Sequence, residues 1–126
     1  RIARTVAQGC EYMHARGLLH GDVYLHNTLV VPEGPPEHSG LSDVRLSDFG
    51  AAAALDDPAF FRLEARSFGW LLQDLIELLA PAPGEPQAAG DAAAAAALLR
   101  ELRGRCAREL PEELPAFSEL AAALAA

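Results

Sequence analysis

The stretch that decides the fold is HGDVYLHN, residues 20–27, followed further along the chain by DFG, residues 48–50. The first stretch places Asp22 five residues before Asn27, on a short polar segment between apolar runs. The second places Asp48 at the end of a short run in which apolar and polar residues alternate. Carboxylate and amide oxygens are the ligands that Mg²⁺ prefers, and one such carboxylate can instead orient an attacking hydroxyl group. These three residues are therefore the candidate site.

The first half of the chain is expected to form one helix and three short strands. Apolar residues recur at helical spacing over residues 1–16, and Gly17 is expected to end that helix. Residues 18–31 predict two short strands around a polar loop, and residues 32–40 predict a turn-rich loop. Alternating apolar residues over 44–49 predict a further short strand.

The second half is expected to contain three helices. After a short connection at 51–62, the strongly apolar run at 63–79 predicts a helix that is buried on nearly all sides. Residues 80–90 predict a linker rich in proline and glycine, and Asp91 is the expected N-cap of a helix that reaches about residue 109. Pro115 is expected to begin the last helix.

Composition narrows the class of protein. The 126 residues are enough for one domain with a real core, and 51% of them are hydrophobic, which excludes a disordered chain. The formal net charge of −8 makes nucleic acid and anionic membranes poor partners. All ten basic residues are arginine, so no Schiff-base or phosphate-binding lysine lies in this stretch.

The compartment follows from features that the sequence lacks. Cys10 and Cys106 have no metal-ligand spacing and are expected to be buried thiols in a reducing compartment. Residues 1–16 do not read as a signal peptide, and charges interrupt the longest apolar run, so a cytoplasmic protein is expected. Because the chain begins with Arg1 and its first Met is Met13, it is expected to be part of a longer protein.

The order of motifs resembles the C-terminal lobe of a eukaryotic-type protein kinase. Residues 12–30 resemble the end of that family's helix E, its catalytic loop and the following strand, and residues 46–52 resemble its metal-binding strand end. Residues 64–79 resemble its central helix F, and residues 106–120 resemble its helices H and I. The resemblance implies an α+β, mostly helical fold over residues 1–126, namely a kinase C-lobe without an N-lobe.

The resemblance assigns roles to the candidate residues. It implies that Asp22 is the catalytic base and that Asn27 and Asp48 are ligands of the Mg²⁺ ion that accompanies ATP. Asn27 is also counted with the catalytic residues. It places Leu29 beneath the adenine ring, with Leu71 and Leu75, one helical turn apart, packed under that position.

The four histidines have different expected positions. His20 and Phe49 fall where the family stacks a hydrophobic spine, and His20 is expected to be a buried packing residue rather than a catalyst. His14, His26 and His38 are expected to be surface residues, because no pair of them has metal-ligand spacing on a helix.

Several positions depart from the family pattern. Gly21 stands where the family has an arginine that clamps a phosphorylated activation segment, and the segment between Gly50 and Glu64 is short and lacks the Ala-Pro-Glu motif. Glu64 replaces an aspartate that binds backbone N–H groups of the catalytic loop. Leu114 replaces an arginine, and Tyr24 replaces a lysine that contacts the γ-phosphate.

The shortened activation segment also has no site for a phosphoryl switch. Residues 51–66 contain no Ser, Thr or Tyr, and Gly21 offers no cation to receive a phosphate. Phe60, Phe61 and Leu63 are expected to hold the segment by packing against the central helix.

The function that the resemblance implies is ATP-dependent phosphoryl transfer to a protein hydroxyl, and a kinase of the Ser/Thr type is expected. The glycine-rich loop and strand lysine of the family would have to come from an N-terminal lobe of the same parent chain, and the fragment alone is expected to be inactive. Two alternatives remain open at this point: a non-catalytic pseudokinase or scaffold module, and a small-molecule phosphotransferase, which also uses His-Gly-Asp with a downstream Asn.

Overall fold

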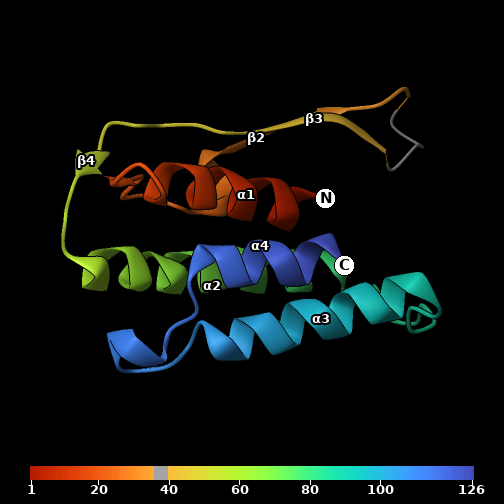
Figure 1. Cartoon of the computed structure of the whole chain (residues 1–126). Coiled ribbons are helices and arrows are strands. Elements are labelled where there is room, and N and C mark those ends of the chain that lie inside the picture. The colour runs from red at the N-terminus through yellow and green to blue at the C-terminus, as the bar shows by residue number, and fades with distance from the viewer. Residues whose placement is uncertain (36–39) are drawn as a thin grey trace.

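In the computed structural model, four helices stack in layers beneath a ribbon of two strands (Figure 1). The helix α1 (Ile2–His14) lies next to the ribbon and packs on α4 (Phe117–Ala125). The longest helix, α2 (Pro58–Leu79), contacts α4 through the rings of Phe68 and Phe117. The helix α3 (Asp91–Arg105) covers the side of α2 that faces away from the ribbon (Figure 1). The arrangement confirms the expected α+β, mostly helical fold.

The strands form two separate antiparallel pairs. β2 (Thr28–Pro32) pairs with β3 (Leu41–Leu46) to make the ribbon, with Val30 opposite Val44 and an irregularity after Val31. β1 (Leu18–Leu19) pairs with β4 (Ala53–Ala54), which lies shortly after the DFG motif. Two short 3₁₀ turns complete the elements, at Leu25–Asn27 and Pro111–Glu113.

The structure describes residues 1–35 and 40–126. Within the first range, β2 continues as far as Pro32, so it takes the first residue of the predicted turn-rich loop at 32–40. The expected surface position of His38 lies outside the described residues. None of the helices in the two described ranges combines the length and the apolar composition needed to span a bilayer.

The central helix begins five residues before its expected start at residue 63. The Asp57 carboxylate caps it by accepting a hydrogen bond of 2.9 Å from the backbone N–H of Ala59, and Pro58 takes the first helical position, where it loses no hydrogen bond. Phe60 and Phe61 therefore belong to α2. The expectation that they are a separate segment packing against this helix is wrong.

The central helix is buried on one side only. Phe68, Leu71 and Leu72 are fully buried, whereas Trp70 and Leu78 are 55% and 74% exposed. The expectation of burial on nearly all sides is therefore wrong, because α1, α3 and α4 cover only part of its circumference. An apolar composition alone does not tell which neighbours are present to cover each face.

The starts of the next two helices are shifted by one or two residues, and α3 ends at Arg105, about four residues before its expected end near residue 109. Gly90, with a φ of +61°, occupies the N-cap position of α3, so Asp91 is the first helical residue rather than the cap. The last helix starts at Phe117 instead of Pro115, and the Glu119 carboxylate accepts a 2.7 Å hydrogen bond from the N–H of Ala116. Such differences at helix ends do not move the site.

The core joins all four helices. Its fully buried members include Val6 and Cys10 of α1, Phe68, Leu71 and Leu72 of α2, Leu102 of α3, and Phe117 and Leu120 of α4. Cys106, at the end of α3, is also buried, so both cysteines have the expected position. Burial raises the pKa of the Cys106 thiol to about 11, and burial together with the Glu64 charge raises the pKa of Cys10 well above its usual range.

Candidate active site

The loop after β1 holds Asp22 and Asn27 in direct contact. The Nδ2 of Asn27 donates one hydrogen bond of 2.8 Å to the Asp22 carboxylate and another of 2.9 Å to the Asp22 carbonyl oxygen. Asn27 is buried, with 6% of its surface exposed, and a 3₁₀ turn that starts after Tyr24 fixes its backbone. The Asp22 carboxylate therefore has a set orientation at the surface of the loop.

The same asparagine connects this loop to the strand end that carries Asp48. The backbone N–H and the hydroxyl of Ser47 each donate a hydrogen bond of 2.7 Å to the carbonyl oxygen of Asn27. Because Ser47 directly precedes Asp48, the two predicted metal ligands lie at the same end of the β2–β3 ribbon. The structure thus brings Asp22, Asn27 and Asp48 together, although they come from two separate segments of the chain.

Asp48 has a strained backbone. Its φ is +58°, and it is the one non-glycine residue with a positive φ in the described ranges. The left-handed conformation costs an ordinary residue about 1–2 kcal/mol, and less for aspartate, whose side chain can bond locally. Here the Asp48 Oδ1 accepts a hydrogen bond of 3.3 Å from the N–H of Gly50. Strain of this kind is concentrated at functional sites, where surrounding contacts maintain it.

His20 links the loop to the DFG segment from inside. Its ring is fully buried, with Nε2 2.8 Å from the carbonyl oxygen of Ser47 and Nδ1 accepting from the N–H of Asp22 at 3.2 Å. Since a carbonyl oxygen only accepts and an amide N–H only donates, His20 carries its proton on Nε2. The ring also lies edge-on to Phe49, with 4.9 Å between centroids, which confirms the expected stack.

Glu64 of α2 holds the loop by its backbone. Its Oε1 accepts a 2.6 Å hydrogen bond from the N–H of Gly21, and its Oε2 accepts a 3.3 Å hydrogen bond from the N–H of His20. The carboxylate is buried, and it reaches the same kind of donors that the resemblance assigns to an aspartate one methylene shorter.

The expectation that His14 is a surface residue is wrong. Its Nε2 lies 2.6 Å from the Glu64 Oε2, and only 12% of its side chain is exposed. The ring packs between Phe61 and Phe117, at centroid distances of 4.8 and 4.9 Å. The sequence carried a signal, since His14 lies four residues after the buried Cys10 and so shares its face of α1. His26, in contrast, is exposed as expected.

Gly21 is required by close packing. Its φ is +87°, and a Cβ at this position would lie 2.5 Å from the carbonyl oxygen of Ala51 and 3.0 Å from the Ala51 Cβ. The backbone just after the DFG motif therefore occupies the space into which an arginine side chain would project. The activation segment can lie in this position only because residue 21 has no side chain.

Backbone hydrogen bonds fix the activation segment. Leu18 and Leu19 pair with Ala54 and Ala53 in the β1–β4 bridge, and the N–H of Leu55 donates to the carbonyl of Gly17 at 3.0 Å. These contacts, rather than the aromatic residues expected from the sequence, hold the segment against the loop.

An arginine side chain joins the start of α2 to the residues around Leu114, which replaces an arginine of the family. The Arg62 guanidinium donates a 2.7 Å hydrogen bond to the carbonyl of Leu114 and lies 3.7 Å from the Glu119 carboxylate. Leu114 itself is buried with 1% exposure. The start of α2 and the start of α4 thus remain connected, with the cation now on α2.

The side chains at the ribbon end fit a Mg²⁺ ion by chemistry. Both hydrogen bonds of the Asn27 side-chain amide use Nδ2, which leaves its Oδ1 available, and Asp48 is exposed. Oxygen donors of these two types suit Mg²⁺, which also retains water and binds phosphate oxygens. No group of three or more His, Cys, Asp or Glu residues able to hold a metal occurs in the part of the chain that is described.

The residues expected near the adenine have mixed positions. Leu29 on β2 is 59% exposed, and its neighbours Val30 and Val31 are exposed as well. Leu71 and Leu75 are core residues of α2, at 0% and 9% exposure. Leu29, Val30 and Val31 thus give the ribbon exposed apolar side chains, and the packing of Leu71 and Leu75 beneath Leu29 stays a prediction.

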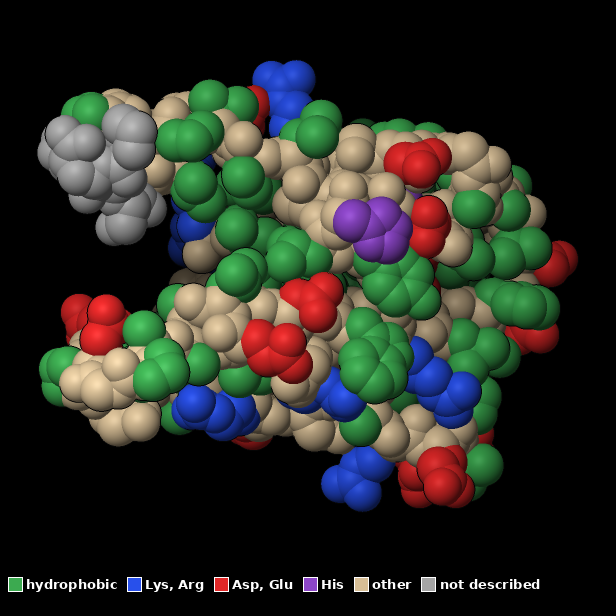
Figure 2. Space-filling view, turned by 180° about the vertical axis from the view of Figure 1, so that it is seen from behind, with side chains coloured by type: hydrophobic (Ala, Val, Ile, Leu, Met, Phe, Trp, Pro, Cys, Tyr) green, Lys and Arg blue, Asp and Glu red, His purple; other side chains and the backbone are tan. Residues whose placement is uncertain are grey.

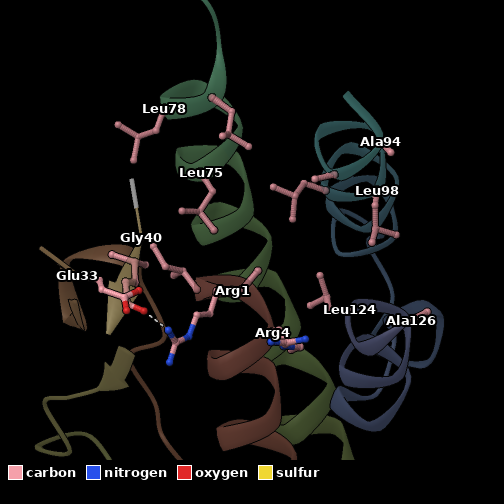
Figure 3. Close-up of a pocket in the computed structure, with 16 residues that line it drawn as sticks. Arg1, Arg4, Glu33, Gly40, Leu75, Leu78, Ala94, Leu98, Leu124 and Ala126 are labelled. Carbon is pink, nitrogen blue, oxygen red and sulfur yellow. Dashed lines mark hydrogen bonds between the residues drawn. The ribbon is translucent and has the colours of Figure 1, made fainter. Parts of the chain in front are cut away.

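A large cavity lies elsewhere in the molecule. It measures about 980 Å³ and opens between the first turn of α1, the last turn of α2 and the start of α3, with Arg1, Arg4, Glu33, Leu75, Leu98 and Leu124 in its wall (Figure 3). Its lining includes none of Asp22, Asn27 and Asp48.

The distribution of charged side chains on the surface is consistent with the formal net charge of −8. On the face seen in Figure 2, acidic side chains lie beside a histidine and among apolar side chains, and basic side chains are scattered without forming one patch. The predicted lack of nucleic-acid and membrane partners stays a prediction.

Two bacterial kinases are similar to this chain in sequence. The serine/threonine-protein kinase PkaB of Streptomyces coelicolor is 34% identical over 104 residues, which are 80% of this chain and 24% of PkaB. The serine/threonine-protein kinase PknF of Mycobacterium tuberculosis is 38% identical over 58 residues, which are 46% of this chain and 11% of PknF. The chain therefore spans a quarter or less of the relatives that it matches, and no protein-family model matches it.

A solved structure gives the same fold. It is described as a divergent kinase lacking the glycine-rich loop, which regulates membrane ultrastructure of the Toxoplasma parasitophorous vacuole. The TM-score is 0.67 at 21% identity, over 95% of this chain and 40% of that one. Together with the bacterial relatives and the site geometry, this likeness identifies the chain as a homologue of serine/threonine protein kinases with the fold of the kinase C-lobe.

Proposed function

We propose that this chain is the catalytic half of an ATP-dependent protein kinase that transfers a phosphoryl group to a protein hydroxyl, in a protein that also carries an N-terminal lobe. The observation that carries the proposal is the position of Asn27, whose side-chain Nδ2 donates to the Asp22 carboxylate at 2.8 Å and whose backbone carbonyl oxygen accepts from the hydroxyl of Ser47, next to Asp48. Phosphoryl transfer depends mainly on such positioning of oxygen groups.

Each residue has a distinct task in this proposal. Asp22 orients the substrate hydroxyl and accepts its proton as transfer proceeds. The Asn27 amide donates to Asp22 through Nδ2 and offers its oxygen, with the Asp48 carboxylate, to Mg²⁺. When bound, Mg²⁺ neutralises charge on the phosphates of ATP. Leu29, which lies beneath the adenine ring in this proposal, and the exposed apolar side chains of the ribbon supply the lower wall of the nucleotide site.

The proposed enzyme needs no phosphoryl switch in its activation segment. The segment has no hydroxyl between residues 51 and 66, and Gly21 cannot be an arginine while Ala51 lies where it does. Backbone pairing of β1 with β4 supports a segment that is already ordered. Activity would be constitutive or set by a partner.

The decisive variant is Asp22→Asn in the full-length protein, assayed by transfer of labelled phosphate from Mg·ATP to a peptide library. Turnover is expected to fall by orders of magnitude while Mg·ATP affinity stays within about twofold, because a base acts in the transition state. Asp74→Asn, on the exposed face of α2, is the matched control and should leave turnover unchanged. Undiminished turnover in Asp22→Asn would refute the proposal.

Asp48→Asn separates the metal role from the base role. It is expected to weaken Mg²⁺-dependent nucleotide binding as well as turnover, since it removes a charged ligand. Calorimetry with ATP, with and without Mg²⁺, measures the difference. Equal ATP affinity with and without Mg²⁺ in both the unsubstituted protein and the variant would contradict the assignment of Asp48.

A non-catalytic kinase-fold module is the second candidate. The tight Gly21–Ala51 contact and the fold likeness to a divergent kinase lacking the glycine-rich loop favour it. It predicts no transfer to any peptide by the full-length protein and no difference between the unsubstituted chain and Asp22→Asn. A metabolite panel run beside the peptide library tests the small-molecule alternative in the same assay.

A further inference from the structure

We propose that the outer face of α2 and the end of α3 form a docking surface for a partner protein that presents an extended acidic segment with an apolar side chain. This surface, called the Arg–Trp surface below, consists of Arg66 and Trp70 of α2, Arg100 and Arg103 of α3, and Arg108 just after α3. It includes no residue of the candidate active site, so the inference does not depend on the proposed function.

Positive charge is concentrated in this part of an acidic chain. Residues 100–108 contain four arginines and one acidic residue, although the formal net charge of the whole chain is −8. Within residues 1–35 and 40–126, no ion pair involves any of these four arginines or Arg66. Their charge is therefore available to a partner of opposite sign.

Contacts between α2 and α3 bring the side chains into one surface. The Arg66 guanidinium donates to the backbone carbonyls of Arg108, at 3.4 Å, and of Glu109, which holds the chain after α3 against α2. Trp70 lies one turn after Arg66 on the same face of α2. The Arg103 guanidinium lies over the Trp70 ring, 4.8 Å from its centroid. The arginines and the indole ring are thus parts of a continuous surface.

Trp70 and Arg103 have the properties of a binding anchor. Trp70 is 55% exposed in spite of its size, and Leu110 nearby in the chain is 51% exposed. The Nε of Arg103 is buried, and no described residue accepts a hydrogen bond from it. Stacking on the indole ring orients the guanidinium in advance, which lowers the cost of binding a carboxylate. Trp and Arg are also the residues that most often dominate the binding energy of an interface.

The spacing of the arginines favours an extended segment over a single anion. Arg100 lies one turn before Arg103 on the same face of α3, and Arg108 lies beyond the end of that helix. In Figure 2, separate basic side chains follow the lower part of the molecule, where α3 lies in Figure 1, with apolar side chains between them. Asp74, one turn after Trp70, ends the positive surface on α2.

The test measures the binding of a fluorescein-labelled peptide to the full-length protein by fluorescence anisotropy. The peptide has about twelve residues, with glutamates on both sides of one central leucine, and spans about 40 Å when extended. Saturable binding is expected. Trp70→Ala and Arg103→Glu are each expected to weaken it by about tenfold or more, because each removes part of the anchor.

A double-mutant cycle identifies the apolar contact. Replacing the central leucine of the peptide with alanine should weaken binding to the unsubstituted protein, but it should have an effect of less than about twofold on Trp70→Ala. Equal effects of the leucine replacement on both proteins would overturn the assignment of Trp70 as the anchor. Arg100→Glu, which changes only the surface of α3, keeps the test decisive if Trp70→Ala does not fold.

Controls separate the Arg–Trp surface from general electrostatic attraction. Arg4→Glu reverses an exposed arginine of α1 and should change the affinity by less than about twofold. A peptide with lysines in place of the glutamates should not bind. Equal weakening by Arg4→Glu and Arg103→Glu, or binding of the lysine peptide, would overturn the proposal.

Two other occupants are outcomes of the same experiments. A dimer of the full-length protein that Trp70→Ala dissociates would assign the surface to a second copy and overturn the proposal. Binding to phosphatidylserine vesicles without binding of the acidic peptide would overturn it in favour of a membrane. If the protein transfers no phosphate, the proposed function fails, whereas the peptide measurements still test the Arg–Trp surface.

Discussion

Replacing Gly21 with alanine tests the packing of the activation segment directly. The new Cβ would lie 2.5 Å from the carbonyl oxygen of Ala51, a distance that real Cβ atoms do not show, so backbone must move. The position also has a φ of +87°, which an alanine adopts only with strain. Two separate costs therefore act at one residue.

The magnitudes of the two costs can be separated with a second glycine. The left-handed φ costs an alanine about 1–2 kcal/mol, and forcing extra atoms into a packed contact costs about 1–3 kcal/mol more. Gly84 has nearly the same φ, +86°, with no atom within 4 Å of its ideal Cβ. Gly84→Ala thus carries the φ cost alone, and Gly21→Ala should be less stable than Gly84→Ala by about 1–3 kcal/mol.

The measurement is the free energy of unfolding by urea for the unsubstituted chain and both variants, with equal m values as the check for two-state behaviour. Proteolysis sites around residues 51–55 should become accessible in Gly21→Ala only, because the segment must leave the loop. Equal losses of stability in the two variants would mean that Ala51 does not pack on Gly21, and the argument about the missing arginine would fail with it.

Of the further predictions, the first concerns the packing of α2 on α3 and the second concerns the burial of the two thiols. Gly69→Ala would place a Cβ 2.8 Å from the Cys106 Cβ and should destabilise the chain by about 1–3 kcal/mol in urea unfolding, whereas Gly104→Ala, with nothing within 4 Å, should be neutral or stabilising by up to about 1 kcal/mol. Burial raises the pKa of both thiols, to about 11 for Cys106, so little thiolate forms at pH 8. Alkylation of Cys10 and Cys106 should therefore be slow until urea unfolds the chain. Fast labelling of either thiol in the folded chain would contradict their burial.

The catalytic loop was predictable because its residues are defined by local spacing. Asp22 and Asn27 lie five residues apart, within reach of one tight turn, and the hydrogen bonds between them require no information from distant segments. The stack of His20 on Phe49 followed from the order of motifs in the family. The positions of these residues are confirmed, while their roles stay predictions.

The contacts between distant segments could not be read from spacing. The Gly21–Ala51 contact joins backbones thirty residues apart, and neither residue type signals the approach. The start of α2 was missed although Asp57-Pro58 is a typical cap and first-turn pair, because the apolar run that follows is stronger. The exposure of Trp70 depends on which neighbours are present, and periodicity does not contain that information.

The left-handed backbone of Asp48 has a consequence for evolution. Glycine adopts a φ of +58° without strain, so Asp48→Gly would relieve the local backbone while removing the carboxylate. Selection for stability alone would therefore drive this position toward glycine, and selection for a charged ligand would oppose it. An aspartate in an unfavourable conformation is the pattern expected of a trade-off between stability and activity.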